Sequence, residues 1–107
     1  MNQKEIELTN KSKFDALNEE LKMMEIKIAH SKHIYVKHRM DEILSRFLPY
    51  LKIKVDNISS KYEPKDNLYY SIVESENSSI QFFYEIIKID EYIQFKLKEA
   101  VVEEKQA

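Results

Sequence analysis

The chain has 107 residues, of which 43% are apolar and 34% charged, and its 17 Lys and Arg against 19 Asp and Glu leave a formal net charge of −2. This length fits one domain, the apolar fraction is too high for a disordered chain, and the near-neutral charge argues against a dominant attraction to nucleic acid or anionic lipid. The absence of cysteine excludes disulfides and thiolate chemistry, and the absence of glycine excludes the glycine-rich loops that hold nucleotides. No apolar stretch has the length of a signal peptide or membrane span, so we expect a cytoplasmic protein without a membrane segment.

The first half of the chain carries helical signals. Residues 5–8 alternate polar and apolar side chains, which predicts a short arm or edge strand within residues 1–10. Asn10 is a suitable helix cap, and apolar residues at spacings of three and four follow it. This stripe falters at residues 29–33 and resumes, shifted in phase, until Pro49. The pattern predicts a helical region over residues 11–48, either as two helices or as one bent helix, which the lack of Gly and Pro near the break favours.

From Leu51 the apolar period changes to two, because Leu51, Ile53 and Val55 alternate with polar residues and predict a first strand. Residues 56–67 are rich in turn formers, and since glycine is absent, Asn or Asp must occupy left-handed turn positions. Residues 68–73, 80–89 and 93–97 predict three further strands separated by short polar turns. The sequence thus predicts a four-stranded antiparallel meander over residues 51–102, followed by a polar tail at 103–107.

Together these elements predict an α+β fold in a single domain over residues 1–107, with a long amphipathic helix, kinked or split, packed on the meander. The order of a short strand, a helix and four antiparallel strands resembles that of cystatin-like folds, in which the sheet wraps the helix. The glycine-containing inhibitory loop of cystatins has no counterpart here, so the resemblance implies no function. An alternative joins residues 79–104 into one helix, which makes the chain mostly α with a central β-hairpin. The crowding of isoleucine and aromatic residues over 80–97 favours strands.

Three histidines, His30, His33 and His38, lie within nine residues of the helical region. At about 100° per residue they diverge around a continuous helix, so they cannot close on one metal ion. The sequence also shows no nucleophile, base and orienting group that would converge. We therefore expect a protein that is not an enzyme and that uses no metal, cofactor or small-molecule substrate.

The two middle strands are apolar on both faces. If Leu68, Tyr70 and Ile72 face the core on one strand, and the even-numbered residues 80–86 face it on the next, five apolar side chains point the other way. They are Tyr69, Val73, Phe83, Ile87 and Ile89. Another part of the chain, such as the second half of the helical region, could cover them. Otherwise this patch has the composition of a protein interface, and a two-fold homodimer is the simplest way to bury it.

The sequence predicts a non-catalytic protein-interaction module, of the kind seen in small phage or mobile-element inhibitors and accessory proteins that bind a host enzyme. Besides the apolar patch, it could present an acidic surface from predicted loop tips, at Glu74, Glu76, Asp90 and Glu91. The alternative is a nucleic-acid-binding protein that uses the basic helical stretch 27–46. Its cations are Lys27, Lys32, Lys37, Arg39 and Arg46. Interspersed carboxylates favour the protein partner over this alternative.

Overall fold

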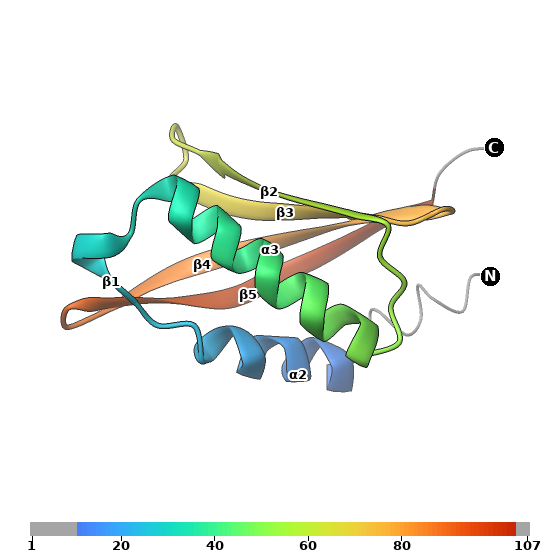
Figure 1. Ribbon diagram of the computed structural model, residues 1–107, viewed down its shortest axis with the longest axis horizontal. Helices are drawn as coiled ribbons and strands as arrows, with labels where there is room; N and C mark the ends of the chain where they lie inside the picture. Colours follow the sequence, from blue (N-terminus) through green and yellow to red (C-terminus); the bar gives the residue numbers. More distant parts are fainter. Residues whose placement is uncertain (1–10, 105–107) are drawn as a thin grey trace.

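The computed structural model describes residues 11–104, which form two α-helices, a short 3-10 helix and five strands (Figure 1). The helices are α2 (Lys11–Lys22), η1 (Ile28–His30) and α3 (His33–Tyr50). The strands are β1 (Ile26–Lys27), β2 (Asn57–Glu63), β3 (Leu68–Glu74), β4 (Ser78–Ile89) and β5 (Tyr92–Glu104). The predicted α+β class is confirmed, and the alternative of one helix over residues 79–104 is wrong. The predicted strand at residues 5–8 and the cap Asn10 lie outside the described residues.

The strands form one antiparallel sheet in the order β1-β5-β4-β3-β2. Strands β2 to β5 form a four-stranded meander, but its first strand, β2, lies within residues 56–67, which the sequence predicted as turns. Strand β1 adds a fifth, two-residue strand on the far side of β5. Both α-helices lie on the same face of the sheet, where their apolar stripes cover its buried side chains (Figure 1). Within residues 11–104, no helix is both long and apolar enough to cross a membrane.

The helical region consists of two helices, so the favoured prediction of one bent helix is wrong. After Lys22 the chain leaves the helix and crosses to the edge of the sheet, where Ile26 pairs with Ile93 and is buried. The N–H of Ile28 then donates to the carbonyl oxygen of Glu91 at 2.8 Å. Burial of Ile26 and these edge hydrogen bonds outweigh the helix propensity of the segment, a tertiary effect that local periodicity does not report.

The predicted strand at residues 51–55 is also wrong, because the segment is the C-terminal cap of α3. The helix continues through Pro49 to Tyr50, and Lys52 adopts a left-handed φ of 64°. The N–H of Ile53 donates to Leu48 and the N–H of Lys52 donates to Pro49, which are the two hydrogen bonds of a Schellman motif. The buried side chain of Ile53 closes the motif, so the alternation reflects a helix cap.

Two turns meet the expectation that Asn and Asp replace glycine. Asn67 ends the turn between β2 and β3 with a φ of 50°, and Asp90 begins the turn between β4 and β5 with a φ of 53°. Short polar side chains tolerate this region better than others do. Lys52 has no such advantage and occupies the position at which helix caps usually carry glycine.

We therefore predict that Lys52→Gly raises the free energy of unfolding by about 0.5–1 kcal/mol, because glycine has no Cβ to clash in the left-handed region. Urea denaturation followed by circular dichroism measures this change. Lys54→Gly is the matched control, since Lys54 is exposed and its φ is not positive. The control should lower stability, and a Lys52→Gly protein no more stable than the parent would contradict the prediction.

Candidate partner-binding face

The sheet has one face free of any described helix, on the side opposite α2 and α3 (Figure 1). We call it the open face and define it by its apolar side chains, which come from β3, β4 and β5. They are Leu68, Tyr70, Ile72, Phe83, Ile87, Ile89, Tyr92 and Val101. Tyr70 and Phe83 are cross-strand partners whose rings stack at a centroid distance of 5.9 Å. The centre of the open face is thus apolar and aromatic.

Charged residues of both signs surround this apolar centre. Glu85 of β4 lies directly opposite Lys96 of β5, and Glu99 lies opposite Phe83. On the other side, Lys61 of β2 lies opposite Tyr70. Opposite residues of an antiparallel pair point to the same face, so all four charges lie on the open face. Glu63, opposite Leu68, and Glu103, opposite Ser79, share this phase at the rim, so carboxylates outnumber lysines on the open face.

Phe83, Ile87 and Ile89 lie on the open face as predicted, but Tyr69 and Val73 do not. Both are buried in the core beneath α3, with 3% and 1% of their surface exposed. The prediction placed β3 one residue out of phase because Ser71 is the only polar residue between Leu68 and Val73. The structure buries Ser71 completely and turns Leu68, Tyr70 and Ile72 outward.

A chain of hydroxyl groups explains the burial of Ser71. The hydroxyl of Tyr84 donates to Ser71 Oγ at 2.8 Å, and Ser71 Oγ lies 2.7 Å from Ser60 Oγ. The chain ends where Ser60 Oγ donates to Asp41 Oδ1 at 2.5 Å. Burial raises the pKa of the Tyr84 phenol well above its usual value. No buried side-chain polar atom within residues 11–104 lacks a hydrogen-bond partner. The chain of hydroxyl groups thus satisfies the polar atoms of the core, and Ser71, which is fully buried, is out of reach of a solute.

A second polar contact closes the end of the core near the start of α3. His33 Nδ1 lies 2.5 Å from the hydroxyl of Tyr69, and the His33 ring stacks on Tyr62 at a centroid distance of 3.8 Å. Burial, together with the neighbouring Tyr62 phenol, raises the pKa of Tyr69 to about 12. Tyr69 is therefore held in its neutral form by the packing of β2, β3 and α3.

The four acidic residues predicted to form a surface lie at two opposite ends of the sheet. Glu74 ends β3 and Glu76 lies in the turn from β3 to β4, whereas Asp90 and Glu91 form the turn from β4 to β5. Strand β4 has 12 residues, so at about 3.3 Å per residue the two ends lie on the order of 35–40 Å apart. They do not form one acidic surface, and Glu76 also pairs with Lys54 at 3.7 Å.

The predicted basic stretch is likewise divided. Lys27 lies in β1 and Lys32 precedes α3, whereas the other three cations lie on α3 itself. Two of those, Arg39 and Arg46, contact the carboxylate of Glu42 at 3.1 and 3.8 Å. Since Lys37 and Arg39 are about 200° apart around the helix, the cations do not line one flank of α3. Nucleic-acid binding by this stretch stays a prediction.

Among residues 11–104, no three His, Asp or Glu side chains come close enough to hold a metal ion. No family model matches the chain, and comparisons with curated proteins and with solved structures found no match. The open face is therefore the surface whose residues and geometry best indicate a function.

We predict that Ser71→Ala lowers the free energy of unfolding by about 1–3 kcal/mol, because it leaves the buried Tyr84 hydroxyl without its acceptor. The double variant Ser71→Ala/Tyr84→Phe should regain part of the lost free energy of unfolding, since it also removes the Tyr84 hydroxyl that has lost its partner. Ser45→Ala is the control, because the Ser45 hydroxyl bonds the Glu42 carbonyl oxygen at the exposed surface of α3. Equal urea midpoints for parent and Ser71→Ala would contradict the structural role of the chain.

We also predict that stability falls as the pH rises from about 10 to about 12. The unfolded chain loses the Tyr69 proton near pH 10, whereas the folded chain keeps it until about pH 12, so the contribution is complete below pH 10. Tyr69→Phe should make the fall in urea midpoint over this range shallower. Tyr84 contributes to the remaining fall, because its pKa is also raised. Tyr50→Phe, at a site with 80% exposure, should leave the slope unchanged.

Proposed function

We propose that this protein is a non-catalytic protein-interaction module that pairs with a second copy of itself through the open face. The observation that carries the proposal is the apolar, aromatic centre of the sheet surface opposite the helices. Tyr70 and Ile72 lie on β3, Phe83 of β4 stacks on Tyr70, and Ile87 lies four residues farther along β4 on the same face. Aromatic side chains at the centre of a surface are the usual anchors of a protein interface.

A second copy is the occupant we propose, because it can use both signs of charge on the open face. The open face carries Glu85 and Glu99 as well as Lys61 and Lys96, so two copies related by a two-fold axis can place opposite charges together. A strongly acidic or basic partner would meet like charges somewhere on this face. Two twisted sheets also pack well face to face, with their strands about 30° apart.

The size of the face sets the expected strength of the dimer. With strands about 4.8 Å apart and a rise of about 3.3 Å per residue, the outward face of β2 to β5 covers on the order of 600 Å². That is somewhat less than the roughly 800 Å² per partner of a standard interface. We therefore expect a dimer that dissociates at micromolar concentrations, and an assembly that another protein can compete with or join.

Sedimentation velocity over a concentration series from about 1 to about 500 µM tests the proposal. The parent should shift from monomer to dimer, and Phe83→Ser/Ile87→Thr should weaken the association at least about tenfold, because it removes two central apolar side chains. Ile34→Ser is the matched control, since Ile34 lies on α3 with 76% exposure and far from the open face.

Far-UV circular dichroism and urea midpoints show whether the Phe83 and Ile87 variant still folds. A parent that stays monomeric throughout the series would overturn the proposal. So would a folded double variant that dimerises as strongly as the parent does.

A further inference from the structure

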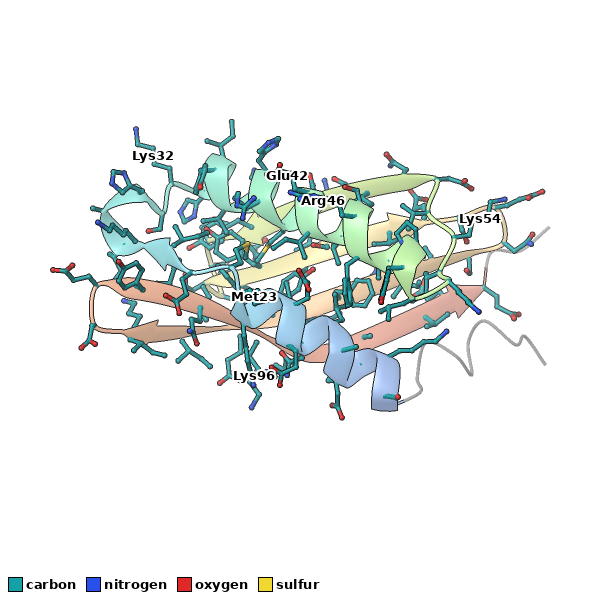
Figure 2. All side chains as sticks on the ribbon, turned by 60° about the horizontal axis from the view of Figure 1, so that its bottom comes forward. Met23, Lys32, Glu42, Arg46, Lys54 and Lys96 are labelled. Carbon is teal, nitrogen blue, oxygen red and sulfur yellow. The ribbon has the colours of Figure 1, made fainter. Side chains whose placement is uncertain are left out.

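The helical side of the molecule carries a groove of about 350 Å³ between the end of α2 and the second half of α3. We call it the helix groove and define it by its lining residues, which come from both sides of the gap. They are Glu20, Met23, Met24, Arg39, Ile43, Arg46, Phe47 and Tyr50. Figure 2 shows Met23 at the end of α2 and Arg46 on α3, both on the helical side of the sheet. The helix groove and the open face therefore lie on opposite sides of the molecule.

The lining of the helix groove has the composition of an interface. Met23 is 78% exposed and Tyr50 is 80% exposed, although both are large apolar side chains. The ring of Phe47 stacks against that of Tyr50 at a centroid distance of 5.8 Å, so two aromatic rings line one side of the groove. Methionine, aromatic residues and arginine are enriched at protein-binding surfaces, and flexible methionine adapts to the side chain it receives.

The arginines determine the charge of the expected partner. Arg39 and Arg46 are seven residues apart on α3, which places them two turns, or about 10.5 Å, apart on one side of the helix. Glu42 contacts both, but its contact with Arg46 is 3.8 Å long and therefore no hydrogen bond. The side chain of Arg46 is 74% exposed, so its guanidinium donors are available to a carboxylate.

We infer that the helix groove binds a peptide segment of another protein, with a large apolar side chain flanked by acidic residues. The apolar side chain enters between Met23 and Tyr50, and a flanking carboxylate reaches Arg46, whereas Arg39 keeps its hydrogen bond to Glu42. A nucleic-acid strand suits the site less well, because thioether and aliphatic side chains make up much of its lining. The inference uses none of the open-face residues, so dimerisation and peptide binding can fail independently.

A phage-displayed library of random dodecapeptides, selected on the full chain, provides the probe. Selected sequences should share an apolar residue flanked by Asp or Glu. Fluorescence anisotropy with a labelled selected peptide should then show about tenfold weaker binding to Arg46→Glu, because the substitution replaces attraction by repulsion. Met23→Ser should also weaken binding, and at 78% exposure this change cannot unfold the core. Lys88→Glu, an exposed reversal on β4, is the matched control.

Methyl NMR on chain labelled at its methionine methyl groups locates the peptide. The signals of Met23 and Met24 should shift on titration, whereas that of Met40, on the buried side of α3 with 0% exposure, should not. Selection of peptides without acidic residues would overturn the inference, as would a failure to select any. Equal affinity for parent and Arg46→Glu, or binding that responds to Phe83→Ser instead, would overturn it as well.

Discussion

The hydroxyl of Ser71 lies between those of Ser60 and Tyr84, and this contact decides which face of β3 is inside. Side chains alternate along a strand, so a slip of one residue would carry Ser71 outward and place Tyr70 and Ile72 beneath α3. The slip would separate three hydroxyl groups that now satisfy one another in the core. The composition of the open face, and the capacity for self-association that we propose for it, therefore depend on a small polar contact inside the protein.

The sequence predicts strands well where its pattern has one interpretation. Ile93, Phe95 and Leu97 alternate cleanly with polar residues, and the structure buries all three in β5. Residues 51–55 alternate in the same way, yet form a Schellman motif, because a helix cap and a strand can both bury every second residue. The hydrogen bonds that distinguish the two involve backbone atoms, which side-chain patterns do not report.

The same limit of side-chain patterns applies to the residues of the candidate surfaces. Phe83 and Ile87 could be placed on the open face because polar Gln81 and Glu85 alternate with them on β4. On β3 only Ser71 interrupts the apolar residues. Ser71 is polar but buried, so its polarity indicates the wrong face. The pairing of Ser60 with Ser71 across the turn at Asn67 is a signal that could have corrected it. No sequence pattern indicated the helix groove, because the groove depends on the path of the chain through β1 between the two helices.

The topology has a consequence for the order of assembly. Strands β2 to β5 pair with chain neighbours, so their hairpins close short loops, whereas the pairing of β1 with β5 joins residues 26–27 to residues 92–93, far apart in the sequence. Besides this two-residue pairing, α2 is held by its buried side chains Leu17 and Leu21 and by a hydrogen bond from the N–H of Leu97 to Asn18 Oδ1. An opening that releases α2 and β1 while the meander stays paired must therefore expose these buried leucines. Such an opening dismantles the helix groove and spares the open face, so occupancy of the groove would lock the N-terminal segment onto the sheet.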